Sequence, residues 1–101
     1  MAASCTKKLI SLDFEVFGKV QGVFFRKHTQ KKGKEYGVVG YVKNTQHSTV
    51  VGQLQGEKQS VDLMKVWLST EGSPKSKITK CQFSKERFIE KVEHTTFSIA
   101  H

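Results

Sequence analysis

At Gly18-Lys19-Val20-Gln21-Gly22-Val23-Phe24-Phe25-Arg26, the chain changes from a strand pattern to a helix pattern. Before this stretch, apolar residues alternate with polar ones, which predicts a strand over about residues 8–17. The stretch itself contains two glycines, no proline, and an arginine at the expected start of the helix. Such a loop can direct several backbone N–H groups at one anion, and a guanidinium beside them suits a phosphate.

Arginine is rare in this sequence, which has only Arg26 and Arg87 among its 17 lysines and arginines. A cation at a helix N-terminus opposes the helix macrodipole unless an anion lies between them. Arg26 could simply hydrate the first helical turn, but its position beside the glycine loop favours an anion-binding role.

The rest of the chain alternates between the two kinds of pattern. A helix is predicted over residues 25–36 and stopped by Gly37, and a second helix is expected from an N-cap at Ser60 to about Ser69. Strands are predicted over residues 38–45, 49–55, 77–83 and 93–99, with the charged residues 84–91 as a loop or short turn. This order predicts an α+β fold of the split βαβ type, an antiparallel sheet of four to five strands with two helices on one face.

Length and composition predict one domain over residues 1–101, of which residues 1–7 are expected to form a flexible N-terminal tail. The sequence has no run of 18 apolar residues and no apolar core of a secretion signal. We therefore expect a cytoplasmic protein that does not associate with a membrane, and a monomer.

Cys5 and Cys81 make neither a disulfide framework nor a metal site, and we expect free thiols.

The net charge of +8 concentrates anions at the surface. Because a basic surface attracts RNA and phosphorylated metabolites alike, charge alone does not separate a nucleic-acid binder from an enzyme with an anionic substrate.

Familiar catalytic motifs are missing from the sequence. It has no serine-hydrolase elbow, no Walker phosphate loop and no zinc-protease motif, and its four histidines are scattered without ligand spacing. Cys81 and Arg87 have the C-x5-R spacing of cysteine-dependent phosphatases, but no glycine lies between them and Glu86 would repel a phosphate. We interpret this spacing as a coincidence, and no metal site is predicted.

Asn44 is the only asparagine and stands near the end of the second expected strand. Asparagine is common in turns, and this one precedes a hairpin connection. Its carboxamide could instead hold a water molecule beside the anion loop, with Thr45 as a second polar contact.

These segments together resemble the acylphosphatases, in particular the small common-type and muscle-type group. Residues 18–26 match the family signature G-x-V-Q-G-V-x-F-R, and residues 40–45 match G-(W/Y)-V-x-N-T. The likeness continues through residues 49–56, 64–68, 72–74 and 97–98, so that it covers nearly the whole chain. The resemblance implies a ferredoxin-like fold.

The resemblance also implies the roles of the site residues. Arg26 binds the phosphate, Asn44 positions the attacking water, and the cradle is formed by the backbone amides of Gln21, Gly22, Val23, Phe24 and Phe25. The implied substrate is an acyl phosphate, with inorganic phosphate as a product inhibitor and no metal or cofactor. The chemistry agrees, because the leaving carboxylate has a conjugate acid with a pKa of about 4 and needs no general acid.

The sequence departs from the family pattern at three places. Ser48 stands where glycine is usual, which costs about 1 kcal/mol if the backbone there is left-handed. Glu57 replaces a common proline, and the end Ala100-His101 differs from the usual basic and aromatic pair, which puts in doubt any contact of the terminus with Arg26.

Two alternatives to an enzyme are open at this stage. The same architecture serves in RNA recognition through aromatic residues on the sheet, although no RNA-binding signature occurs in this sequence. The chain could also be a regulatory anion-binding domain without turnover.

Overall fold

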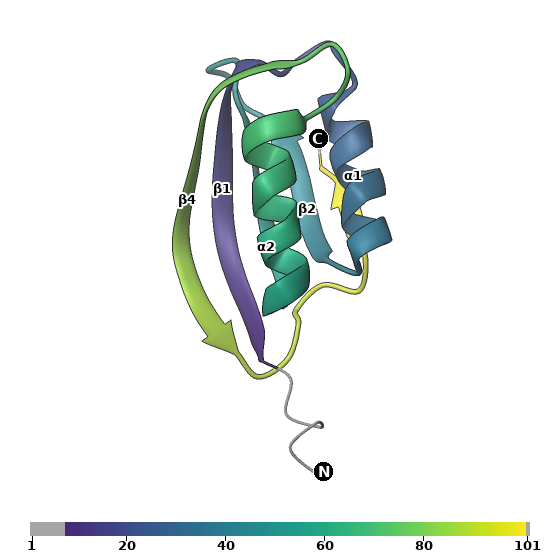
Figure 1. Ribbon diagram of the computed structural model, residues 1–101, viewed down its shortest axis with the longest axis vertical. Helices are drawn as coiled ribbons and strands as arrows, with labels where there is room; N and C mark the ends of the chain where they lie inside the picture. Colours follow the sequence, from purple (N-terminus) through teal and green to yellow (C-terminus); the bar gives the residue numbers. More distant parts are fainter. Residues whose placement is uncertain (1–7, 101) are drawn as a thin grey trace.

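The computed structural model describes residues 8–100, in which five strands form one sheet with two α-helices on one of its faces (Figure 1). The elements are β1 (Leu9–Lys19), α1 (Phe25–Tyr36), β2 (Val39–Asn44), β3 (Val50–Glu57), α2 (Lys58–Val66), the π-helical turn η2 (Trp67–Glu71), β4 (Lys77–Ile89) and β5 (Phe97–Ile99). The predicted α+β ferredoxin-like fold is confirmed. The expectations for residues 1–7 and for His101 lie outside the described residues.

The strand order in the sheet is β4-β1-β3-β2-β5. Because β3 pairs between β1 and β2, the β1-α1-β2 unit is split, as the order of elements predicts. Three pairs of strands are antiparallel, but β5 pairs parallel with β2. The sheet is therefore mixed rather than antiparallel throughout, since the chain after β4 crosses to the opposite edge and enters β5 in the direction of β2 (Figure 1).

The core lies between the sheet and the two helices. Leu12, Phe14 and Val16 of β1 are buried there. Helix α1 packs very closely, because a Cβ added to Gly33 would lie 2.6 Å from the Phe97 ring of β5. The first turn of α1 contributes Phe25, whose ring centroid lies 5.7 Å from that of Trp67. Packing thus fixes both the start and the middle of α1 against the sheet.

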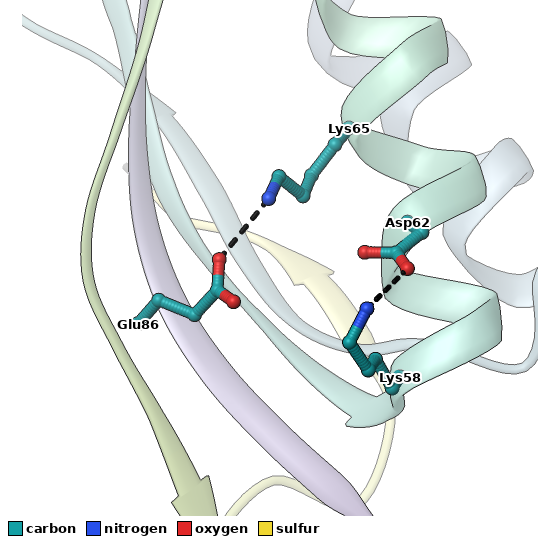
Figure 2. Close-up of polar contacts among 4 residues, drawn as sticks. All are labelled: Lys58, Asp62, Lys65 and Glu86. Atoms are coloured by element: carbon teal, nitrogen blue, oxygen red, sulfur yellow. Dashed lines mark hydrogen bonds and ion pairs between the residues drawn. The ribbon is translucent and has the colours of Figure 1, made fainter.

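The first helix has the predicted bounds, and the second does not. Gly37 ends α1 in the left-handed conformation (φ 77°), and its N–H donates to the Lys34 carbonyl at 3.2 Å. Helix α2 begins at Lys58 directly after β3, so the predicted N-cap Ser60 lies inside its first turn. An ion pair of 2.9 Å between Lys58 and Asp62 spans this turn (Figure 2).

Strand β4 is longer than predicted, because residues 84–89 continue it instead of forming a loop. It pairs with β1 as far as Leu9 and Ile89, across an irregularity near Lys85, whose φ is 54°. An edge strand leaves one side in solvent, so charged residues are compatible with it. One of them, Glu86, forms a 3.0 Å ion pair with Lys65 of α2 (Figure 2).

Strand β5 is shorter than predicted, covering residues 97–99 rather than 93–99. The backbone N–H of Glu93 donates to Oε1 of Gln55 at 2.7 Å, so a side chain of β3 binds the segment before β5. Within residues 8–100, no helix has the length and hydropathy that a bilayer crossing requires.

We predict that Ser48→Gly stabilises the protein. Ser48 has φ 65° in the turn between β2 and β3, a conformation that glycine adopts without the steric cost that a Cβ brings. The free energy of unfolding, measured with urea, should rise by about 0.5–1 kcal/mol. Ser98→Gly in β5, where φ is not positive, should lower it. A Ser48→Gly protein no more stable than the parent would contradict the steric argument.

Candidate functional site: an anion cavity between α1 and β2

The loop between β1 and α1 has alternating backbone conformations. Val20 donates its N–H to the Gly18 carbonyl at 3.1 Å, Gly22 has φ 74°, and Phe24 has φ 58° and ψ 27°. Phe24 occupies the N-cap position of α1, where its side chain makes no capping hydrogen bond. Residues of positive φ that alternate with residues whose φ is not positive curl the chain, which favours successive N–H groups on one side.

The amides of this loop have no partner in the described part of the chain. Within residues 8–100, the backbone N–H groups of residues 21–26 have no hydrogen-bond acceptor. The first turn of α1 also contains no acidic residue. Unpaired donors and the positive end of the helix dipole act at the same place, and together they favour an anion.

A cavity of about 450 Å³ lies beside these amides. It is lined by Val20, Gly22, Phe24, Phe25, Arg26, Lys27, Asn44 and Ile99. The two residues singled out in the sequence as catalytic, Arg26 and Asn44, thus line the same cavity, although they come from different elements. Arg26 is half-buried and Asn44 is exposed. No carboxylate among residues 8–100 pairs with Arg26.

Gln21 positions the loop relative to Asn44. Its Nε2 donates to the carbonyl oxygens of Thr45 at 3.0 Å and of Thr49 at 2.9 Å. These two residues flank the turn that follows β2, and Asn44 itself pairs with Val50 at the end of the ladder. The side chain of Gln21 therefore binds the loop to the hairpin, which fixes the distance across the cavity.

Thr45 acts within the turn. Its Oγ1 lies 2.7 Å from Oγ1 of Thr49 and accepts hydrogen bonds from the N–H groups of His47 and Thr49. Thr49 in turn donates to Oε2 of Glu15 on β1 at 2.6 Å. These contacts hold the end of β2, and the hydroxyl of Thr45 is not among the groups that line the cavity.

The predicted site residues thus fall into two groups. Gly22, Phe24, Phe25, Arg26 and Asn44 line the cavity. Gln21, Val23 and Thr45 do not, since Gln21 and Thr45 bind the hairpin and the side chain of Val23 is in the core.

Sequence reasoning missed three lining residues, Val20, Lys27 and Ile99. Lys27 could have been found, because it follows Arg26 in the first turn of the helix. Ile99 reaches the cavity through the parallel pairing of β5 with Val42 of β2, which no local pattern indicates.

Other chemical groups lie elsewhere. Burial raises the pKa of the Cys81 thiol to about 11, which disfavours a reactive thiolate. Cys81 pairs with Val16 and Arg87 with Ser11, so the two lie far apart along β4. Among residues 8–100, no three histidines, cysteines or carboxylates gather in a way that could hold a metal ion.

Comparison with known proteins gives one consistent family. The acylphosphatase family profile matches residues 12–99. The chain is 62% identical to acylphosphatase-1 of Xenopus tropicalis over 90 residues, which cover 89% of this chain and 92% of that protein. It is 57% identical to acylphosphatase-1 of Homo sapiens over 91 residues, 90% of this chain and 92% of the human protein.

Solved structures agree with the sequence comparison. The acylphosphatase from Bacillus subtilis superposes with a TM-score of 0.83 at 29% identity, covering 91% of this chain and 99% of that one. The acylphosphatase from Coxiella burnetii gives a TM-score of 0.81 at 31% identity, covering 92% and 94%.

We predict that Gln21→Leu weakens anion binding and stability together. The change removes both hydrogen bonds and leaves the Thr45 carbonyl without a donor, whereas the Thr49 carbonyl keeps the N–H of Thr45 at 2.9 Å. The free energy of unfolding should therefore fall by about 1–2 kcal/mol. Calorimetric titration should show a dissociation constant for inorganic phosphate that is several-fold higher.

Gln30→Leu is the matched control for Gln21→Leu. It removes a comparable hydrogen bond from Nε2 of Gln30 to the Phe97 carbonyl, at 3.0 Å, which does not involve the loop. This variant should lose stability but keep its affinity for phosphate. Unchanged phosphate affinity in Gln21→Leu would contradict the positioning role of Gln21.

Proposed function

Since the chain belongs to the acylphosphatase family and is an enzyme that hydrolyses acyl phosphates, we propose that Arg26 and Asn44 carry out this hydrolysis in the cavity between α1 and β2. The observation that supports the proposal most is that these two residues, from separate elements, line one cavity beside unpaired amides. The next steps assign a role to each group.

The loop amides and Arg26 bind the phosphoryl group. The N–H groups of residues 21–25 and the guanidinium of Arg26 offer donors in a curled arrangement, and charge-assisted hydrogen bonds of this kind are about twice as strong as neutral ones. As negative charge shifts among the phosphoryl oxygens in the transition state, fixed donors stabilise it without reorganising.

Asn44 positions the attacking water. A carboxamide has both a donor and an acceptor, so it can bind a water molecule and orient one lone pair. Among residues 8–100, the side chain of Asn44 has no hydrogen-bond partner, which leaves both groups available. Holding water in line with the bond that breaks supplies the entropic advantage of a positioned reactant.

The reaction needs no side-chain acid. Water oxygen forms a bond to phosphorus, the phosphorus–oxygen bond to the acyl group breaks, and the electron pair leaves with the carboxylate. Its conjugate acid has a pKa of about 4, so the carboxylate departs unprotonated at neutral pH. Among residues 8–100, the only ionisable side chains that line the cavity are those of Arg26 and Lys27, and we assign the water proton to a phosphoryl oxygen of the substrate. In this proposal, neither a metal nor a cofactor takes part.

The proposal extends to inhibition, assembly and location. Inorganic phosphate fits the same donors as the substrate, so it should compete with substrate. All groups assigned to the reaction come from one chain, which agrees with a monomeric enzyme, and the sequence favours the cytoplasm.

Binding of RNA has no such support, because Asp13 and Glu15 lie beside a cavity on the sheet, where they would repel phosphates.

We predict that Asn44→Ala mainly lowers kcat. Benzoyl phosphate hydrolysis, assayed with chelator present, should fall by about 100-fold or more, because loss of one positioning or stabilising group at a reacting centre has effects of this size. Urea unfolding should show the fold intact, since the side chain is exposed. Gln46→Ala, two residues along in the turn, is the control and should keep full activity.

Arg26→Gln should differ from Asn44→Ala in its kinetics, because it removes charge from the bound phosphoryl group in both ground and transition states. We expect KM to rise together with the fall in kcat, and phosphate to inhibit less well. Full activity in the Asn44→Ala protein would overturn the assignment of Asn44.

We predict that kcat is nearly independent of pH from about pH 7 to about pH 8.5. Above the second pKa of the phosphoryl group, about 6, the substrate is fully ionised. Because the proposal contains no enzyme side chain that gains or loses a proton in this range, kcat should vary less than about twofold. A steady-state pH–rate profile with one essential ionisation there would count against proton transfer to the substrate.

A further inference from the structure

Phe24 is exposed and conformationally strained. Its side chain is 72% exposed, and its backbone is left-handed, with φ 58° and ψ 27°. A bulky residue in this conformation costs about 1–2 kcal/mol. Neither property benefits the fold, since burial would stabilise an aromatic ring and glycine would relieve the backbone. Strain that is retained at the edge of a cavity is typical of a group with a role in ligand binding.

A second cavity, of about 350 Å³, lies along the first turns of α1. It is lined by Phe24, Lys27, His28 and Lys31. Because Phe24 and Lys27 also line the first cavity, the two cavities adjoin along α1. Asn44 lines only the first. In-line displacement places the leaving acyl oxygen on the opposite side of phosphorus from the attacking water. Because Asn44, to which we assign the water, does not line the second cavity, that cavity is a candidate position for the acyl group.

His28 holds this second cavity in shape. Its backbone N–H donates to the Phe24 carbonyl at 3.1 Å, and its ring Nδ1 lies 2.9 Å from the same oxygen. Since a carbonyl oxygen only accepts, Nδ1 carries the hydrogen in this contact. Two hydrogen bonds to one oxygen stabilise the N-cap residue, and with it the position of the Phe24 ring.

The lysines of the second cavity form no ion pair within the part of the chain that the structure describes. Along residues 8–100, no carboxylate forms an ion pair with Lys27 or Lys31, whereas Lys32 on the same helix pairs with Glu35 at 3.3 Å. Four residues of helix place Lys31 about 6 Å further along the axis than Lys27. Two free cations therefore extend from the phosphoryl cavity, next to an exposed aromatic ring.

We propose that the second cavity binds the acyl group of the substrate, with the Phe24 ring packing against its carbon skeleton and Lys27 and Lys31 binding a second negative charge on it. This inference rests on the proposed function. The enzyme accordingly favours acyl phosphates that carry a carboxylate or phosphate at the far end of the acyl group. Phe24 and Lys31 determine specificity, while Arg26 and Asn44 perform the reaction.

The test compares benzoyl phosphate with 4-carboxybenzoyl phosphate, which differ only in the distal carboxylate group. We expect wild type to have the higher kcat/KM for the carboxylated substrate. In Lys31→Gln, the ratio of the two kcat/KM values should fall about two- to fivefold, as loss of an exposed ion pair implies. Lys34→Gln removes the same charge from α1 at an exposed residue that lines neither cavity, and it should leave the ratio at the wild-type value.

Phe24→Asn separates the ring from the backbone. Asparagine tolerates the left-handed conformation, so the protein should fold at least as stably and keep its affinity for inorganic phosphate. The ratio of kcat/KM for benzoyl phosphate to that for acetyl phosphate, whose methyl group is too small to pack on the ring, should fall several-fold.

The outcomes separate this inference from the proposed function. If Lys31→Gln, Lys34→Gln and wild type gave the same ratio of kcat/KM for the two aryl substrates, the assignment of the second cavity as the acyl site would be wrong. Hydrolysis of benzoyl phosphate would still support the proposed function. A wild-type protein that hydrolyses neither aryl substrate would overturn both.

Discussion

The two hydrogen bonds from the Gln21 carboxamide to the turn after β2 determine the geometry of the site. The sheet alone does not do so, because its ladders fix β1, β3 and β2 relative to one another but leave the β1–α1 loop unpaired. Gln21 and the Thr49–Glu15 hydrogen bond join the turn to the loop and to β1. The start of α1 and the end of β2 are thereby held as one unit, and a site held on rigid elements keeps its reacting groups in register.

The same region is electrostatically unfavourable when it is empty. Arg26 and Lys27 lie in the first turn of α1, at the positive end of the helix dipole, with no acidic residue in that turn. Packing of Phe25 and Gly33 against the rest of the core compensates for this cost, because it fixes the helix whatever its charge. An anion bound to the loop removes the repulsion, so ligand binding and folding reinforce each other.

Local signals predicted the first part of the fold well. The strand before residue 18, the helix at 25–36 and the stop at Gly37 all follow from patterns within a few residues of each other. Sequence patterns gave wrong element bounds where contacts between distant segments determine the structure. The charged residues 84–89 look like a loop, yet they pair with residues 9–13 of β1 at the edge of the sheet. The irregularity at Lys85 breaks the alternation that would have indicated a strand.

The site shows the same division between local and tertiary information. Gly22, Phe25 and Arg26 were found because the loop and the helix start are adjacent in sequence, and Asn44 through the pattern of a strand end. Ile99 was missed, since the crossing to β5 brings it there. Gln21 was expected to offer its backbone amide, and its side chain adds a structural role that depends on the hairpin being close.

Ser48 and Phe24 show how differently the same backbone strain can be used. Both are non-glycine residues with positive φ, 65° and 58°. Ser48 lies in an exposed turn and lines none of the cavities beside α1, so its strain lowers stability without shaping a site. Phe24 lines both cavities beside α1, and its left-handed backbone helps to curl the loop that precedes the helix. Relieving strain at Phe24 without keeping that curl would misplace the amides to which we assign phosphoryl binding, whereas relieving it at Ser48 alters only the turn.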